Sequence, residues 1–374
     1  MTTHILTVKE GHVNDAVNDF LKHLLSSKKI AALLVPQATP AKKTPFPVLI
    51  TDPKKLHADI IAPVMPSSTA KILSHMTKVQ APAKPIGVVI RSCQIKALFE
   101  LAKLNQAKLD NLIIIGVDCL GTFPLTTYTS FPEKQAPSKF LLEAFTKKTT
   151  DAEKYLRTSC SVCLEPIPIN SDITIGLFGM DVDKELLIEA NTDMGKKLLD
   201  GLTLPAAHEN THREKAVKDL HEAQSKKHAA FIEEKTGIQG IDALAAFFET
   251  CVNCHNCRVA CPICYCKECL YDSAVFDQEA YKFVRKAEAK GLYKMPTDSV
   301  LFQLGRMNHM ILSCVQCGLC EQACPNSIPL MDVFIKVADK TQKTFEYHPG
   351  KTKDEKIPMV VYREDEFTEV GEKE

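Results

Sequence analysis

Cysteine is the residue through which this sequence could do most chemistry. The chain has 15 cysteines in 374 residues, and seven of them stand in one stretch, CVNCHNCRVACPICYCKEC (residues 251–269). Thiolates are soft ligands that favour zinc, copper(I) and iron–sulfur clusters over hard ions. The spacing between the thiols is therefore the first guide to what they bind.

Two segments repeat the spacing C-x2-C-x2-C-x3-C-P. Bacterial ferredoxins use this spacing, and the fourth cysteine of each run then serves the other cluster. Three thiolates two residues apart can converge on one cube, while the fourth, within a short helix, points toward a second. The spacing predicts two [4Fe–4S] clusters with crossed ligands. The first would use Cys251, Cys254, Cys257 and Cys324, and the second Cys314, Cys317, Cys320 and Cys261.

A pair of zinc knuckles is the alternative for these two runs, since zinc also binds C-x2-C pairs. Zinc sites seldom repeat the whole four-cysteine frame with its closing proline, which is Pro262 in one run and Pro325 in the other. The iron–sulfur interpretation is therefore favoured.

Three cysteines of the dense stretch remain outside this scheme: Cys264, Cys266 and Cys269. A distant thiolate, His255 or His309 could complete a further cluster or a zinc site with them. The alternative is that they are partly spare thiols.

Four more cysteines lie upstream. Cys93 stands at a strand-to-helix junction, where helix amides favour a thiolate or a bound anion, and Cys119 follows the next strand. If the two strands are parallel neighbours, both residues lie at the carboxyl edge of the sheet, where α/β proteins bind ligands. With the C-x2-C pair Cys160 and Cys163, they predict a third [4Fe–4S] cluster. The alternative for Cys93 and Cys119 is an ordinary buried thiol.

The elements that must position these thiols divide into two kinds. The first 200 residues predict an α/β unit with a mixed, largely parallel sheet, in which 86–90 and 112–117 are joined by a helical crossover. Helices and cysteine loops follow, with helices expected at 211–235, 273–289 and 299–312. We expect four parts: an α/β domain (1–200), a charged helical linker (201–240), an all-α ferredoxin-like domain (241–338) and an extended tail (339–374), laid on a partner or frayed.

Composition narrows the class of partner. Lys+Arg and Asp+Glu both number 46, so the chain is formally neutral and a poor candidate for wrapping nucleic acid. The start of the chain lacks the features of a secretory signal, and no apolar run reaches the roughly 18–20 residues that span a bilayer. The sequence therefore predicts a cytoplasmic protein, where disulfides are rare and many cysteines indicate metal or redox chemistry.

The upstream motifs RSCQIKAL, LIIIGVDCLGTF, CSVCLEP and NSDITIGLFG resemble the beta subunits of coenzyme F420-reducing hydrogenase and related formate dehydrogenases over residues 80–195. In that family a G-x-P-C-Q/E stretch is followed by a strand ending in Cys-x-Gly, and then by C-x2-C before an A/S-D-I-x-x-G strand. The two cysteine runs, about fifty residues apart, are similar to helical ferredoxin modules of succinate dehydrogenase and heterodisulfide reductase subunits.

The resemblance implies that the α/β domain binds FAD beside one [4Fe–4S] cluster. The flavin would exchange a hydride with a soluble carrier, coenzyme F420 or NAD(P). No GxGxxG motif in the sequence independently indicates a flavin or nicotinamide site. Ser92 stands where the family often has proline, which could alter the turn beside the flavin. The flavin contacts implied by position are Arg91, Ser92, Gln94, Gly121 and Thr122.

The leading functional hypothesis is an electron-transfer subunit of a multisubunit oxidoreductase. Its partner would be a formate dehydrogenase or hydrogenase catalytic subunit, or a heterodisulfide-reductase-like subunit, because this chain shows no molybdopterin or nickel site. One alternative is a pure iron–sulfur relay without flavin. The other is a zinc-stabilised scaffold without redox function.

Overall fold

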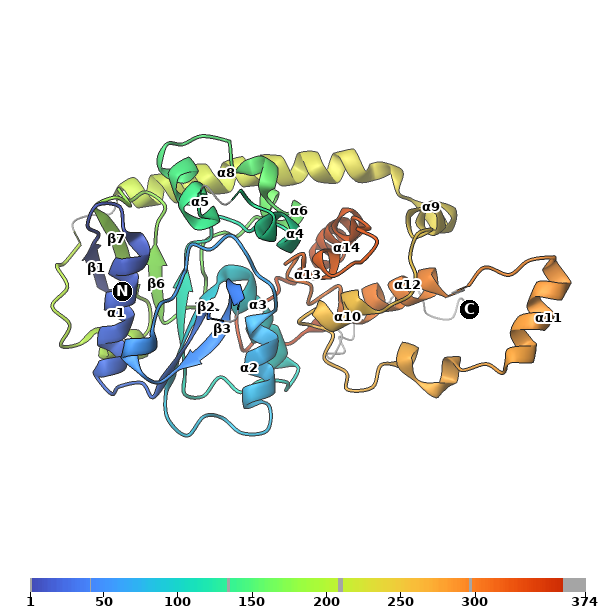
Figure 1. Ribbon diagram of the computed structural model, residues 1–374, viewed down its shortest axis with the longest axis horizontal. Helices are drawn as coiled ribbons and strands as arrows, with labels where there is room; N and C mark the ends of the chain where they lie inside the picture. The colour runs from blue at the N-terminus through green and yellow to red at the C-terminus, as the bar shows by residue number, and fades with distance from the viewer. Residues whose placement is uncertain (1, 41, 133–134, 208–210, 296–297, 359–374) are drawn as a thin grey trace, which may run out of the picture.

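A seven-stranded mixed sheet organises the N-terminal half of the chain (Figure 1). The computed structural model describes residues 2–40, 42–132, 135–207, 211–295 and 298–358. The strand order is β1-β7-β6-β5-β4-β2-β3, and the central strands β2, β4, β5 and β6 are parallel, with antiparallel strands at both edges. The strands are β1 (Thr2–Thr7), β2 (Ala32–Thr39), β3 (Lys42–Ile50), β4 (Ile86–Arg91), β5 (Leu112–Val117), β6 (Ile173–Gly176) and β7 (Glu185–Ala190).

The two faces of this sheet bury two different hydrophobic cores. Successive side chains of a strand point to opposite faces, so Val88 and Ile90 of β4 join one core while Val89 joins the other. Helix α1 (Val13–Ser26) covers the second core together with α7 (Asp193–Leu199). Helices α2 (Thr69–Thr77) and α3 (Ser92–Lys103) cover the first. The predicted α/β class and the parallel β4–α3–β5 crossover are confirmed.

Short helices and a long one surround the sheet's carboxyl edge. Helices α4 (Leu125–Thr129), α5 (Pro137–Thr146) and α6 (Thr158–Ser161) follow β5. Helix α8 (Thr211–Glu234) then runs along the molecule toward the cysteine-rich part (Figure 1). It matches the helix expected at 211–235.

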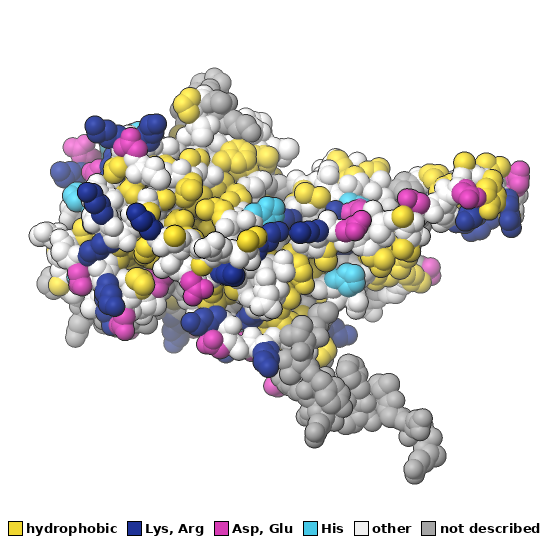
Figure 2. Space-filling view, turned by 90° about the horizontal axis from the view of Figure 1, so that it is seen from below, with side chains coloured by type: hydrophobic (Ala, Val, Ile, Leu, Met, Phe, Trp, Pro, Cys, Tyr) yellow, Lys and Arg dark blue, Asp and Glu magenta, His cyan; other side chains and the backbone are white. Residues whose placement is uncertain are grey.

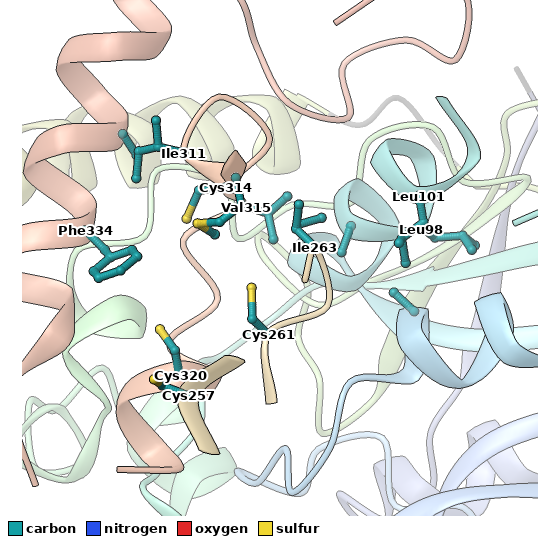
Figure 3. Close-up of a cluster of buried hydrophobic side chains, with 14 of the residues drawn as sticks. Leu98, Leu101, Cys257, Cys261, Ile263, Ile311, Cys314, Val315, Cys320 and Phe334 are labelled. Carbon is teal, nitrogen blue, oxygen red and sulfur yellow. The ribbon is translucent and has the colours of Figure 1, made fainter. Parts of the chain in front are cut away.

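The cysteine-rich part is helical, as the sequence predicts. It contains α9 (Gly240–Phe247), α10 (Asn256–Ala260), α12 (Ser299–Met310), α13 (Leu319–Gln322) and α14 (Leu330–Thr344). Its apolar side chains share one continuous core with α3, because Leu98 and Leu101 belong to the same cluster as Phe334 and Cys261 (Figure 3). In the described residues, no helix has an apolar stretch long enough to cross a lipid bilayer.

The helix expected at 273–289 begins later than predicted. Two 3-10 turns, Leu270–Asp272 and Ala274–Phe276, precede α11 (Ala280–Lys290). The Ser273 hydroxyl donates to the Leu270 carbonyl at 2.6 Å, and such local bonds compete with the helical ladder. The predicted end is confirmed, because Gly291 adopts φ 75° at the C-terminus. Helix α11 projects as an arm with Tyr281 and Val284 exposed (Figures 1 and 2).

The tail also differs from the extended segment expected at 339–374. Helix α14 continues to Thr344, and the chain then returns to α3. There the Tyr347 hydroxyl and the Gly350 amide donate to the buried Glu100 carboxylate, with 2.7 and 2.8 Å between the atoms. This segment therefore packs on its own chain. Residues 359–374, which include most of the apolar IPMVVY stretch, lie outside the described residues.

Candidate metal centres

The four upstream cysteines converge at the carboxyl edge of the sheet. Cys93 lies in the first turn of α3 directly after β4, and Cys119 follows β5, which is the parallel neighbour of β4. Cys160 lies on α6, and Cys163 follows that helix. All four side chains line one cavity of about 520 Å³. The structure thus brings together the four residues that the sequence grouped, although their role as ligands stays a prediction.

One of these thiols has a different electrostatic environment from the others. Burial raises the pKa of Cys93, and it raises the pKa of Cys119 to about 11. Burial also acts on Cys160, but the Arg157 guanidinium and hydrogen bonds from Thr122 outweigh it, so that the pKa of Cys160 is lowered. Thr122 Oγ1 lies 3.3 Å from Cys160 Sγ. Cys160 is therefore the thiol of this group most readily converted to the metal-binding thiolate.

The two ferredoxin-type loops have the same backbone conformation. The third residue of each loop, Asn253 in one and Gln316 in the other, has φ 53°. The fifth residue, His255 or Gly318, has φ 58° or 71°. These paired left-handed positions curl each loop around a centre. Gly318 is constrained further, because a Cβ there would lie 2.5 Å from Ser159 Oγ.

The thiols of the two runs are grouped in the crossed way that the spacing predicts, while their assignment as cluster ligands stays a prediction. Cys324 lines one small cavity with Cys251, Cys254 and Cys257. Cys261 instead lies between Cys314 and Cys320 of the second run (Figure 3), and the charges of Cys261 and of Cys314, Cys317 and Cys320 interact. One detail differs from expectation: the short helices α10 and α13 hold the third cysteine of each run, and the fourth follows the helix.

Cys264 lies with Cys261 and the thiols of the second run, although the sequence grouped it with Cys266 and Cys269. Its thiol hydrogen-bonds to the Cys261 sulfur, which holds the pKa of Cys261 at about 6 and raises the pKa of Cys264. Cys266 is exposed and Cys269 is half-buried. The second group therefore contains a fifth thiol.

The histidines considered for the remainder have other environments. His255 hydrogen-bonds to Asp272 and stacks on Phe302 with 3.9 Å between ring centroids, and His309 is exposed. Among the described residues, no three or more His, Cys, Asp or Glu side chains lie close enough to hold a single metal ion. The site predicted on Cys264, Cys266 and Cys269 thus has no assembled ligand set. Cube ligands lie farther apart than the ligands of one ion, because iron corners separate them.

The five residues implied as flavin contacts do not share one location. Ser92 and Gly121 line the cavity of the upstream cysteines, and Ser92 Oγ is buried there without a hydrogen-bond partner. Thr122 is buried against Cys160. The other two lie beside a different, smaller cavity: the Arg91 guanidinium donates to the carbonyls of Ala62 and Val64, and the Gln94 side chain accepts hydrogen bonds from the Ser68 hydroxyl and the Ala70 amide.

Sequence reasoning missed two buried arginines beside these thiols. Arg157 is 5% exposed and Arg306 is 3% exposed. The sequence carried a signal for one of them, because Arg306 lies midway between Phe302 and Met310 on the apolar stripe of a predicted helix. A charged residue in such a stripe either reaches solvent or has a buried counter-charge.

The fold and the thiol geometry define an iron–sulfur protein in which an α/β unit precedes a helical dicluster unit. Residues 83–212 match the family model for the C terminus of the beta subunit of coenzyme F420 hydrogenase/dehydrogenase. Residues 247–328 match the model of a 4Fe–4S dicluster domain. Residues 83–212 are thus similar to this beta-subunit family of oxidoreductases, and residues 247–328 are similar to iron–sulfur dicluster domains, which confirms the resemblance seen in the sequence.

Two curated relatives match the chain over nearly its whole length. The F420-dependent formate dehydrogenase subunit beta of Methanocaldococcus jannaschii is 27% identical over 376 residues, covering 92% of this chain and 93% of the relative. The F420-dependent formate dehydrogenase 1 subunit beta of Methanococcus maripaludis is 29% identical over 382 residues, covering 92% of each. Among solved structures, a chain of the xenon-derivatised F420-reducing [NiFe] hydrogenase complex from Methanosarcina barkeri matches with a TM-score of 0.46 and 15% identity, covering 65% of this chain and 94% of that chain.

Proposed function

We propose that this chain passes electrons between a soluble hydride carrier and a catalytic partner subunit through FAD and three [4Fe–4S] clusters. The upstream cluster would be held by Cys93, Cys119, Cys160 and Cys163. The middle cluster would use Cys261 and the first three cysteines of the second run. The outer cluster would use Cys324 and the first three cysteines of the first run. The proposal includes a cytoplasmic location, where thiols stay reduced.

The observation that carries this proposal is the continuity of the three thiol groups. Cys317 and Cys314 of the middle group line the same cavity as the four upstream cysteines. Cys257 of the outer group lies within electrostatic range of Cys320 of the middle group. Each group is therefore a neighbour of the next, which supports stepwise electron transfer along the row.

The cavity of the upstream group fits part of a flavin. Its volume lies in the range of cofactor pockets, and apolar side chains such as Leu120, Phe145 and Phe178 line much of it. The orphaned Ser92 hydroxyl provides a donor for a ligand that brings its own acceptors. When bound, a flavin supplies the exchange of a hydride for single electrons. The lysines that line the cavity, Lys96, Lys227 and Lys343, are each paired with a carboxylate, so a bound cofactor would meet ion pairs there and not free cations.

The names of the curated relatives favour coenzyme F420 as the carrier and a formate dehydrogenase catalytic subunit as the partner. NAD(P) is the alternative carrier, and a hydrogenase or heterodisulfide-reductase-like subunit is the alternative partner. None of these choices changes the roles assigned to the thiols.

Anaerobic purification followed by metal, sulfide and flavin analysis tests the proposal. We expect about twelve iron atoms per chain, four for each of three clusters, with matching acid-labile sulfide and one FAD. Reduced coenzyme F420, NADH and NADPH are then added in turn, and the visible absorbance of flavin and clusters is followed. We expect bleaching with reduced F420. Clusters without FAD, bleached by none of the carriers, would support the pure relay instead. Zinc without sulfide would support the scaffold.

A further inference from the structure

The two buried arginines lie at the junctions between thiol groups. Among the described residues, neither guanidinium forms an ion pair with Asp or Glu, although Arg157 and Arg306 are each at least 95% buried. Burying a guanidinium without a counter-charge is costly. The chain must therefore supply negative charge near each arginine when it is in its working state.

Arg157 lies between the upstream and middle groups. Its Nη2 donates to Cys160 Sγ at 3.7 Å, while its Nε and Nη1 are buried without a hydrogen-bond partner. Its charge also acts on Cys93 of the upstream group and on Cys317 of the middle group. The backbone holds it in place, because the Arg157 amide donates to the Thr122 carbonyl at 2.9 Å.

Arg306 occupies the equivalent position between the middle and outer groups. Its Nη1 donates to Gln303 Oε1 at 3.0 Å and its Nη2 to the Cys257 carbonyl at 3.4 Å, whereas Nε has no partner. The Phe334 ring lies 4.8 Å from the guanidinium carbon. Its charge acts on Cys257 of the outer group and on three thiols of the middle group, those of Cys320, Cys261 and Cys264.

We propose that Arg157 and Arg306 are counter-ions, each shared by two consecutive clusters, that raise the reduction potentials of both neighbours. This proposal rests on the proposed function, because it needs the three clusters. A cube with four thiolate ligands carries net negative charge, and accepting one electron adds one more negative charge. A fixed cation nearby therefore stabilises the reduced form more than the oxidised form.

This arrangement has a specific consequence for the row of clusters. The middle cluster lies beside both arginines, whereas the upstream and outer clusters each lie beside one. The N–H groups of both side chains that lack partners can donate hydrogen bonds to the thiolate and sulfide sulfurs of a cluster. Each arginine is thus a positioning and tuning residue, because it acts through the clusters.

Redox titration of the full chain, monitored by electron paramagnetic resonance, tests the proposal. The variants are Arg157→Gln, Arg306→Gln and the charge-conserving Arg157→Lys and Arg306→Lys. The control is Arg285→Gln, which removes a solvent-exposed arginine from α11. In Arg157→Gln we expect the midpoint potentials of the upstream and middle clusters to fall, and in Arg306→Gln those of the middle and outer clusters. The midpoint potential of the middle cluster should therefore fall in both variants. At the wild-type midpoint potential the ratio of reduced to oxidised cluster should drop about tenfold, a shift of 59 mV for one electron. The Lys variants and the control should stay close to wild type.

Full iron content with unmoved midpoints in both Gln variants would overturn the counter-ion role, as would an equal fall in the Lys variants. If a Gln variant loses its clusters, the iron content of the matching Lys variant tests the proposal. Iron retained in the Lys variant shows that the position requires a positive charge, and iron lost from it contradicts the counter-ion role. Wild-type protein without acid-labile sulfide would instead refute the proposed function itself, so the two failures are distinguishable.

Discussion

Asp118 and Arg213 form a buried ion pair with 2.6 Å between Oδ2 and Nη1, although 95 residues separate them in the sequence. The Asp118 carboxylate also accepts from the backbone amides of Leu177 and Phe178, at 2.8 and 3.0 Å. A Cβ at Gly176 would lie 2.7 Å from Arg213 Nη1, so glycine makes room for the guanidinium. This pair fixes the start of α8 to the carboxyl edge of the sheet, next to the cavity of the upstream cysteines.

Removing the arginine of this pair should destabilise the protein strongly. Arg213→Ala leaves the Asp118 charge buried and unpaired, and we expect a loss of about 3–5 kcal/mol in the free energy of unfolding. Denaturant titration followed by circular dichroism measures it. Lys227→Ala, which breaks a half-exposed ion pair with Glu153, is the matched control and should change stability little. Similar effects of the two substitutions would contradict the importance of the buried pair.

The returning C-terminal segment should contribute measurably to stability through one hydroxyl. Tyr347→Phe removes the donor to Glu100, a carboxylate that is fully buried. Hydrogen bonds to charged groups are worth about 1.5–3 kcal/mol, so we expect a loss of that order. Thermal unfolding under anaerobic conditions measures it, with the exposed Tyr281→Phe as control. An unchanged melting temperature in Tyr347→Phe would show that the segment is not held by this contact.

The ion pairs of Glu165 predict a pH dependence. Burial raises the pKa of this carboxyl group, but hydrogen bonds and charges from His348 and Lys96 outweigh burial and lower the pKa to about 2. Because the folded-state pKa lies below the usual value of about 4.5, these interactions stabilise the protein fully above pH 4.5. Their contribution is lost progressively as the pH falls from about 4.5 toward 2.

Comparing wild type with Glu165→Gln tests that window. Urea unfolding is measured between pH 6.5 and 3.5, using only samples that keep their visible cluster absorbance. We expect the stability difference between the two proteins to be constant down to about pH 4.5 and to narrow below it. A difference that widens as the pH falls would have the wrong sign for a lowered pKa.

The crossed thiol geometry predicts an asymmetry between the two fourth cysteines. Cys324→Ser should remove about four of twelve irons, those of the outer cluster. Cys261→Ser should retain most of its iron, because the Cys264 thiol hydrogen-bonds to the Cys261 sulfur and lies close enough to replace it. The double variant Cys261→Ser/Cys264→Ser should then lose about four irons. Iron content is measured in all three variants. An equal loss of iron from Cys324→Ser and Cys261→Ser would show that Cys264 does not replace Cys261 as a ligand.

Local patterns predicted most of the scaffold. Apolar runs and the crossover indicated that β4 and β5 are parallel neighbours, and that topology brings Cys93 and Cys119 to one edge. The repeated cysteine spacing indicated the crossed grouping, because loop reach is a local property. Residues 274–276 show the limit of periodicity, since they form a 3-10 turn where the apolar pattern favours a helix.

The residues that sequence reasoning missed depend on contacts between distant segments. Arg213 meets Asp118, Tyr347 meets Glu100, and Arg157 lies near Cys317 only after the two halves of the chain have packed together. No spacing rule relates such residues. The flavin contacts show the opposite error: Arg91 and Gln94 are close in sequence to Cys93, yet their side chains lie beside another cavity.

The arm that carries α11 leaves the body between the two cysteine runs, and no residue of α11 is buried. Under the proposed ligand scheme, the last cysteine of each run binds the cluster of the other run. Each cluster therefore has ligands from the segment before the arm and from the segment after it. A protease cut within α11 should leave both fragments joined through their clusters. The arm can therefore change in length, charge or apolar surface from one relative to the next, and neither cluster needs to adapt.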